Sequence, residues 1–365
     1  MLLYAWFVFV FLLGAGVGSF LNVCIYRLAY EKSILWPLGS YCGQCFQPIR
    51  WYDNLPLVSY WLLRGRCRKC RARFSARYFV IELFTALAFL GLFYLEVVLN
   101  VHNLDALKPQ NLLLVNQIRL GLIPFQGWLI FFFHAVLVSL LIVASFIDLD
   151  HMEIPLSLTA TGTVIGLVAG ALMFPYLPAQ NVTSVPVAAP MILRALNLEL
   201  KPGLYPWPVW HELPAWMPPT SWLAGLATGL AGMVVGMLML RGVRFVFGVG
   251  RGLEGLGVGD ADLMMMAGAF VGWQPIVVAF FVGVFPALFF GIYQLVSRGN
   301  QELPFGPSLA IGIVATLLGW QWIGRRLLPL AYEPLVILFL GGAAVVFLFV
   351  AAVLLRITRR TGEEA

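Results

Sequence analysis

Apolar stretches of about 20 residues, the length that crosses a bilayer as a helix, recur along the chain. Of its 365 residues, 61% are hydrophobic and only 11% are charged, and the mean hydropathy is +0.89. A soluble domain is about 45–50% apolar and about 25% charged. A water-soluble globule of this length could not bury so much apolar surface, and the composition also excludes a disordered or fibrous chain. We therefore expect an all-α polytopic membrane protein.

Nine apolar stretches are candidate membrane segments, so we expect eight or nine membrane segments, depending on whether the short sixth stretch is counted. They cover residues 2–23, 79–99, 127–147, 156–174, 222–240, 261–273, 275–296, 305–323 and 335–355. The first stretch has no small-x-small cleavage site, so we expect a retained helix rather than a signal peptide. A short polar turn is expected at residues 148–155 and a glycine-rich loop at residues 241–251.

The net charge of +6 comes from one segment. Residues 27–77 contain ten basic and two acidic residues, a sum of +8, so the other 314 residues sum to −2. Lys and Arg collect in cytoplasmic loops, so this segment is expected to face the cytoplasm and the N-terminus to lie outside. Only Arg325 and Arg326 disagree with that orientation. No aromatic and basic binding face accompanies the charge, so a nucleic-acid partner is not expected.

Four of the five cysteines form two pairs within this basic segment. The pairs are Cys42 with Cys45 and Cys67 with Cys70, each with two residues between its members. Two such pairs complete a tetrahedral four-thiolate zinc site, which leaves no open position and is therefore structural. Redox dithiols and disulfides are the alternatives, and the reducing cytoplasm argues against standing disulfides. Cys24 is expected to be a small packing residue.

Carboxylates lie where apolar helices meet loops, and ionisable groups at membrane depth are usually functional. The first cluster contains Asp148, Asp150 and Glu153, and the second contains Asp260 and Asp262. Two carboxylates that come close cannot both ionise easily, so they share a proton, as aspartic peptidase chemistry requires. Helix capping is the alternative, and it is favoured for Asp150, Glu153 and Asp262. The pattern alone does not choose Asp148 over Asp150.

Two glycines precede the second cluster. Gly257 and Gly259 lead into Asp260 in the segment GLGVGDADLMM. Glycine lets the backbone turn tightly and approach a bound peptide closely. We therefore expect these glycines to support a site at Asp260.

Several motifs, in one order, make the chain similar to the type IV prepilin peptidase family of GxGD membrane aspartic peptidases. The motifs are GSFLNVCIYRL (18–28), IRWYDNLPLVSYWLLRGRCRKC (49–70), RYFVIELFTALAF (77–89), FIDLDHMEIP (146–155), GLGVGDADLMMMAGAFVGWQ (255–274) and PFGPSLAIG (304–312). The resemblance implies that Asp148 and Asp260 form the catalytic dyad. It implies cleavage of type IV prepilins or type II secretion pseudopilins after Gly at the cytoplasmic face of the bacterial inner membrane.

The family also implies a second activity, N-methylation of the new terminal residue with S-adenosylmethionine as methyl donor. No residue set in this chain identifies where that cofactor binds. The main functional alternative is an ion- or proton-coupled transporter with Asp148 and Asp260 as a relay. A thiol oxidoreductase and a scaffold protein are weaker alternatives. The particular pilin and the oligomeric state are left open.

The expected organisation follows from these segments. Residues 1–26 form the first membrane helix, 27–78 a cytoplasmic zinc-binding domain, and 79–174 three helices that carry Asp148. Residues 175–221, with ten of the 22 prolines, form a Pro/Trp-rich periplasmic loop. Residues 222–355 form the C-terminal helices with the GxGD motif, and 356–365 a cytoplasmic tail.

Overall fold

The computed structural model divides into two compact units, residues 1–158 and 159–365. The residues it describes are 2–34, 39–102, 104, 107, 118, 120–176, 216–218, 221–251, 257–298 and 304–331, with a few more between 339 and 350. Most of the expected Pro/Trp-rich loop and of the expected helix at 335–355 lies outside the described residues.

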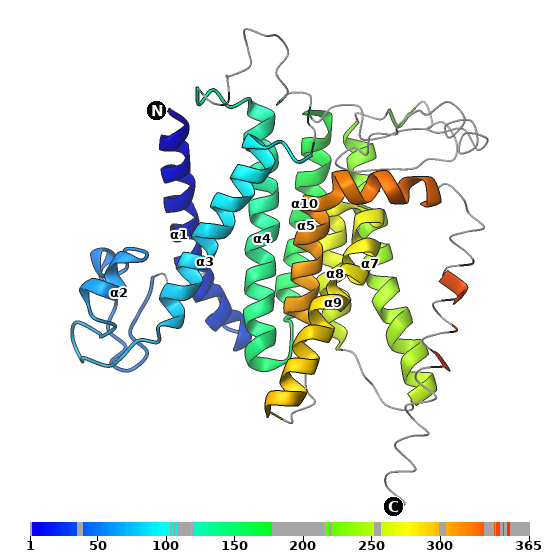
Figure 1. Ribbon diagram of the computed structural model, residues 1–365. Helices are drawn as coiled ribbons and strands as arrows, with labels where there is room; N and C mark the ends of the chain where they lie inside the picture. Colours follow the sequence, from blue (N-terminus) through cyan, green and yellow to red (C-terminus); the bar gives the residue numbers. More distant parts are fainter. Residues whose placement is uncertain are drawn as a thin grey trace, which may run out of the picture. The chain divides into compact units, whose positions relative to one another are not determined.

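The described part of the first unit contains three long helices: α1 (Leu2–Ala29), α3 (Arg77–Phe93) and α4 (Phe125–His151) (Figure 1). α1 packs against both α3 and α4, and α3 is extended by a single π-helical turn, η2 (Tyr94–Val98). The close contact of α1 with α3 depends on Gly14 and Gly18. A Cβ at either position would lie 2.8 Å from a backbone Cα of α3. Small residues four apart are a common device for close packing of membrane helices.

Short elements connect α1 to α3. They are the 3-10 turn η1 (Trp51–Asp53) and the helix α2 (Val58–Leu62), and they belong to the segment that carries the four paired cysteines. Two isolated backbone bridges, Tyr41 with Pro48 and Arg66 with Arg73, are the only β pairing among the described residues. The all-α fold class is thus confirmed.

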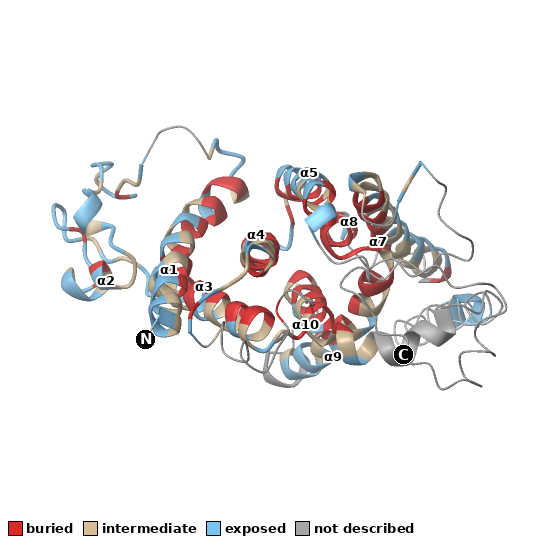
Figure 2. Ribbon diagram, turned by 90° about the horizontal axis from the view of Figure 1, so that it is seen from above, coloured by how far each residue is buried: buried red, intermediate tan, exposed pale blue. Residues whose placement is uncertain are grey.

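Within its described residues, the second unit contains α5, three further long helices and the short helix α8. The elements are α5 (Leu156–Met173), η5 (Phe174–Tyr176), α7 (Trp222–Arg251), α8 (Val258–Val271), α9 (Trp273–Arg298) and α10 (Gly306–Ala331). α7 packs on α8, and α9 packs on α10. Figure 2 shows that α8 is the most completely buried of these helices: 11 of its 14 residues are buried.

Seven described helices are long and apolar enough to cross a membrane. With only 14 residues, α8 is shorter than the roughly 20 that a bilayer needs, so it is an internal helix covered by its neighbours. Two helices run further than hydropathy predicts. α4 continues to His151 and α7 to Arg251, so the expected polar turn is reduced to residues 152–155 and the expected glycine-rich loop is helical up to Arg251. No proline interrupts either extension.

Glycine determines how closely α7 and α8 approach. A Cβ on Gly268 would overlap the carbonyl oxygen of Gly232, and a Cβ on Gly232 would overlap that of Gly268. A Cβ on Gly236, one turn further along α7, would overlap the carbonyl oxygen of Met264 in the same way. Both backbones would have to move to admit a side chain.

We expect Gly268→Ala to lower thermal stability in detergent, at a cost of about 1–3 kcal/mol, because an added methyl group would push α7 from α8. The matched control is Gly242→Ala on α7. A Cβ on Gly242 would meet no atom within 4 Å, so alanine there only improves helix propensity. Equal melting temperatures for the two variants would show that the α7–α8 contact does not need glycine.

Candidate functional site

The four paired cysteines are held by two copies of one backbone turn, 25 residues apart in the sequence. In the first copy the N–H of Phe46 donates to Cys42 O at 2.9 Å, and in the second the N–H of Arg71 donates to Cys67 O at 3.0 Å. Phe46 and Arg71 both adopt positive φ, at 56° and 61°. The repeated turn directs both sulfurs of each pair to one point.

The sulfurs of Cys42, Cys45, Cys67 and Cys70 all lie within 4.8 Å of one another. The distance from Cys42 Sγ to Cys70 Sγ is 3.7 Å. Tetrahedral coordination with Zn–S bonds of about 2.3 Å separates ligand sulfurs by about 3.8 Å, so the cluster has the dimensions of a metal site. Backbone N–H donors, first that of Cys70 and then that of Lys69, lower the pKa of Cys67 to about 7.

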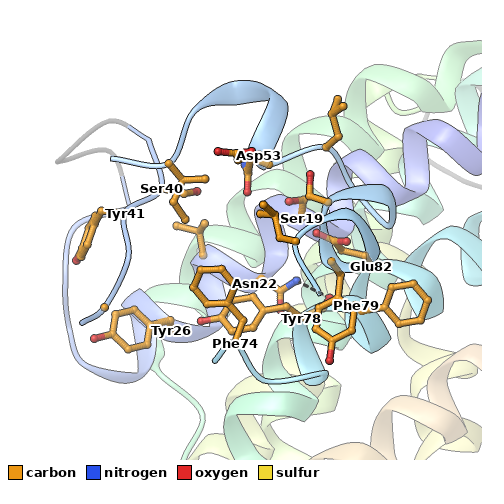
Figure 3. Close-up of a pocket in the computed structure, with 18 of the residues that line it drawn as sticks. Ser19, Asn22, Tyr26, Ser40, Tyr41, Asp53, Phe74, Tyr78, Phe79 and Glu82 are labelled. Atoms are coloured by element: carbon orange, nitrogen blue, oxygen red, sulfur yellow. Dashed lines mark hydrogen bonds between the residues drawn. The ribbon is translucent and has the colours of Figure 1, made fainter. Parts of the chain in front are cut away.

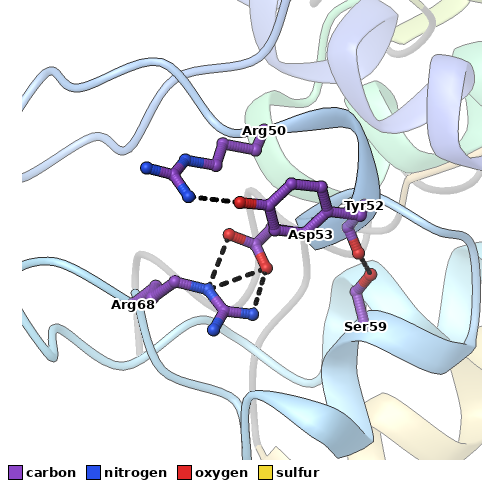
Figure 4. Close-up of polar contacts among 5 residues, drawn as sticks. All are labelled: Arg50, Tyr52, Asp53, Ser59 and Arg68. Carbon is purple, nitrogen blue, oxygen red and sulfur yellow. Dashed lines mark hydrogen bonds and ion pairs between the residues drawn. The ribbon is translucent and has the colours of Figure 1, made fainter.

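Polar contacts fix the segment around the cysteines (Figure 4). Arg68 forms a bidentate ion pair with Asp53, with its Nε 3.0 Å and 2.9 Å from the two carboxylate oxygens. The hydrogen bond from Arg68 lowers the pKa of Asp53 below its usual value. Beside this pair, Arg50 donates to the hydroxyl of Tyr52. At the start of the segment the buried Arg27 donates to the carbonyl oxygens of Ile34 and Gly39.

A cavity of about 250 Å³ lies between this segment and the ends of α1 and α3 (Figure 3). Aromatic rings and carboxylates share its wall. The labelled side chains that line it are Ser19, Asn22, Tyr26, Ser40, Tyr41, Asp53, Phe74, Tyr78, Phe79 and Glu82. Glu82 Oε2 accepts a hydrogen bond from the Leu57 N–H at 2.7 Å, and Asn22 donates to Tyr78 O at 3.1 Å. The cavity is therefore built by both the helices and the cysteine segment.

The first acidic cluster lies at the C-terminal end of α4. Asp148 is 5% exposed, and its carbonyl oxygen accepts the Met152 N–H that ends the helix. Asp150 forms a bidentate ion pair with Arg77 at the start of α3, at 2.7 Å and 2.6 Å. Asp150 thus joins two helices and does not cap an N-terminus, whereas Glu153 is exposed in the turn before α5. The structure therefore separates Asp148 from Asp150, which the sequence pattern alone does not.

The second acidic cluster lies in the first turns of α8. Gly257 is the N-cap residue, and Asp260 lies in the first helical turn with an exposed fraction of 7%. Gly259 lies within the same turn. Asp262 lies 3.4 Å from Arg241 of α7, so it too has an arginine partner instead of a capping role. Asp148 belongs to the first unit and Asp260 to the second.

A third cluster consists of Glu96, His102 and His134, which no sequence pattern brings together. All three side chains are buried in the first unit. Glu96 and His134 lie on two different helices and His102 lies in a loop, so no spacing rule connects them. Only a contact between residues that lie 38 positions apart in the sequence reveals the group.

The chain matches two descriptions of protein families. Residues 12–95 match the Bacterial Peptidase A24 N-terminal domain, and residues 135–205 and 207–292 match the Type IV leader peptidase family. The first match includes the four cysteines, and the second includes both acidic clusters. No solved structure matches the chain.

Curated relatives agree with these matches. The chain is 31% identical to the prepilin leader peptidase/N-methyltransferase of Myxococcus xanthus over 80% of its own length and 64% of the relative, slightly less than two thirds of that protein. It is 29% identical to the protein of the same name from Aeromonas salmonicida, over 86% of this chain and 91% of the relative. It is 28% identical to the type 4 prepilin-like proteins leader peptide-processing enzyme of Escherichia coli, over 83% of this chain and 90% of the relative.

These comparisons give no support to the transporter alternative. Seven candidate spans and bacterial relatives indicate a multi-pass protein of the inner membrane. The order of the motifs, the helical architecture and the matched regions agree along most of the chain. The chain belongs to the type IV leader peptidase family.

Proposed function

We propose that this protein is a membrane aspartic endopeptidase that removes the leader from prepilins or pseudopilins and then methylates the new N-terminus. The observation that carries the proposal is the family match over residues 135–292, which contains two buried aspartates at helix ends, Asp148 and Asp260. The relatives bear the names of leader peptidases and N-methyltransferases.

Asp148 and Asp260 are the proposed dyad. In aspartic peptidase chemistry one carboxylate takes a proton from the attacking water, and the other, protonated, donates to the scissile carbonyl oxygen. The neighbouring Asp150 forms an ion pair with Arg77, and Asp262 forms one with Arg241. Each pair joins two helices, so we assign these two acids a structural role. Gly257 and Gly259 carry no side chains, so a peptide can approach the backbone closely at these two positions before Asp260.

The proposed substrate is a membrane helix preceded by a basic leader that ends in Gly. Its cleavage site would lie at the cytoplasmic membrane edge, where the sequence predicts both acidic clusters. Under the positive-inside rule, the basic segment and both clusters face the cytoplasm and the N-terminus faces the periplasm. Pilus assembly and type II secretion are the processes that such substrates serve.

Residues 27–78 form the proposed zinc-binding domain, with Cys42, Cys45, Cys67 and Cys70 as ligands. The sulfur spacing and the repeated turn support zinc in this position. A four-cysteine site has no free position for a substrate, so its role is to fold the segment. That segment forms one wall of the cavity in Figure 3.

The same cavity is the proposed site of S-adenosylmethionine. Its aromatic rings and carboxylates suit a sulfonium cation, which binds to aromatic faces and negative charge. Small-molecule sites usually measure about 300–1,000 Å³, so a cavity of about 250 Å³ would hold part of the cofactor and leave its methyl group accessible. Tyr26 and Glu82 are the residues that would contact the cation, since Asp53 is already paired with Arg68.

The proposed function is tested with purified protein in liposomes and a prepilin as substrate. We expect cleavage after the leader Gly without any cofactor, and a mass increase of one methyl group on the new N-terminus only when S-adenosylmethionine is present. Glu82→Gln should reduce methylation and spare cleavage. If the prepilin stays intact, the peptidase proposal is wrong. If it is cut but never methylated, the methyltransferase half is wrong.

A further inference from the structure

The cluster of Glu96, His102 and His134 lies far from Asp148 of the first unit. His134 and Asp148 are 14 residues apart on α4, a separation of about 21 Å at the rise of an α-helix. None of its members belongs to the four-cysteine group. The cluster therefore has no part in the proposed cleavage or in the four-cysteine site, and it calls for a separate explanation.

Both imidazole rings of the cluster contact the same carboxylate oxygen of Glu96. Glu96 Oε1 lies 2.5 Å from His134 Nδ1 and 2.9 Å from His102 Nε2. The exposed fraction of each side chain is 1% or less. The two imidazole rings have centroids 5.5 Å apart and planes inclined at 60°, so their nitrogens approach the carboxylate from different directions.

Two polar atoms of the cluster are unsatisfied. Glu96 Oε2 and His134 Nε2 are buried and make no hydrogen bond within the described part of the chain. A buried polar atom without a partner costs about 1–3 kcal/mol, and a native structure normally has a reason for it, such as a bound ion. Residues next to the cluster in the sequence are buried as well: Val97 follows Glu96, Val101 precedes His102, and Ile130 lies one turn before His134. A bound ion would give Glu96 Oε2 the partner that it lacks.

Two local irregularities of the backbone bring the ligands together. Glu96 lies within the π-helical turn η2, where the Leu99 N–H donates to Tyr94 O at 2.9 Å. His102 follows Asn100, which has φ 49° and whose side chain makes two hydrogen bonds with the backbone of Leu104, at 2.8 Å and 2.9 Å. Single π turns occur frequently at functional sites. Here each irregularity positions one member of the cluster.

We propose that Glu96, His102 and His134 bind a divalent transition-metal ion, for which zinc is the natural occupant. Two histidines and one glutamate form a known ligand set for zinc, and imidazole favours this class of metal. The ion would bind the lone pairs of His102 Nε2 and His134 Nδ1, so each neutral imidazole would carry its proton on its other ring nitrogen, and the unpartnered Oε2 of Glu96 would supply a fourth donor atom. Bonds of about 2.0–2.1 Å require each of these two nitrogens to move away from Glu96 Oε1 by less than about 1 Å.

The burial of the cluster indicates a structural metal. No side chain of the three is open to solvent, so a substrate cannot reach the ion. The ion connects the end of α3, the loop after it and the middle of α4. At the opposite end of this helix pair, Arg77 and Asp150 already connect the two helices.

The test begins with the unmodified full-length protein, purified in detergent with zinc present and then dialysed. We expect about two zinc ions per chain, and an X-ray absorption spectrum that shows both sulfur and nitrogen/oxygen ligands, with about two sulfurs per zinc on average. A single zinc with four sulfur ligands would overturn the proposal, and this result needs no variant.

Variants then assign the ligands. His134→Gln, His102→Gln and Glu96→Gln should each lose about one zinc per chain, and the zinc that stays should show sulfur ligands alone. His151→Gln is the matched control, because His151 is an exposed histidine at the other end of α4. Unchanged zinc content in the folded cluster variants, or equal loss in the control, would overturn the assignment. These measurements use no prepilin, so their outcome does not depend on whether the proposed peptidase function is correct.

Discussion

Asp148→Asn and Asp260→Asn should each abolish prepilin cleavage, with kcat reduced at least about 10³-fold. Each substitution keeps the shape of the side chain but removes its capacity to carry a proton between water and the scissile carbonyl. Positioned acid–base groups contribute about 10²–10⁴-fold to a rate, and a dyad that shares one proton fails when either member is lost. The measurement is the initial cleavage rate in liposomes.

The chain provides two matched controls. Asp150→Asn and Asp262→Asn change the same residue type two positions away and break the ion pairs with Arg77 and Arg241. Partly exposed ion pairs contribute about 0–1 kcal/mol, so these variants should keep cleavage within several-fold of the unmodified protein. If Asp148→Asn cleaves normally while Asp150→Asn does not, the first member of the dyad is misassigned.

The second large effect concerns the cysteines. Cys42→Ser should remove the sulfur-ligated zinc and leave the segment from residue 39 to residue 74 open to limited proteolysis. Binding of a structural zinc supplies about 10–16 kcal/mol of apparent free energy at pH 7 to small zinc-finger peptides, so this segment, which has few buried apolar residues, depends strongly on the metal. Metal content and the rate of proteolysis are the two measurements.

Cys24→Ser is the control for this experiment. Cys24 is a buried cysteine of α1 outside the four-cysteine cluster, so its replacement changes sulfur content without changing the ligand set. Zinc content should stay the same in Cys24→Ser and fall by about one ion per chain in Cys42→Ser. A Cys42→Ser protein with its full sulfur-ligated zinc would show that the cluster does not hold the metal.

Some features of this molecule follow from local sequence and others from contacts across the fold. Hydropathy predicts most helices, because a span must be apolar over about 20 residues. The spacing of Cys42 with Cys45 and of Cys67 with Cys70 predicts their cluster, because each pair needs only one turn of backbone. Hydropathy does not predict the extension of α4 to His151, because it marks where the apolar stretch ends and not where the helix ends.

Contacts between distant segments have no signal in the sequence. Arg77 and Asp150 lie 73 residues apart and meet only because α3 and α4 pack side by side. The cluster of Glu96, His102 and His134 also forms only through the fold. Glu96 lies on a π turn, His102 in a loop and His134 inside a helix. The dyad of Asp148 and Asp260 comes from the resemblance to the family and from their burial, and it stays a prediction.

The π turn η2 makes the direction of His102 depend on the exact number of residues that precede it. A π turn contains one residue more than an α-helix needs for the same rise, and an α-helix rotates about 100° per residue. The extra residue therefore turns the following chain by about a quarter of a revolution. Insertion or deletion of a single residue between Tyr94 and Val98 would point His102 in a different direction, although the hydropathy of the span would hardly change.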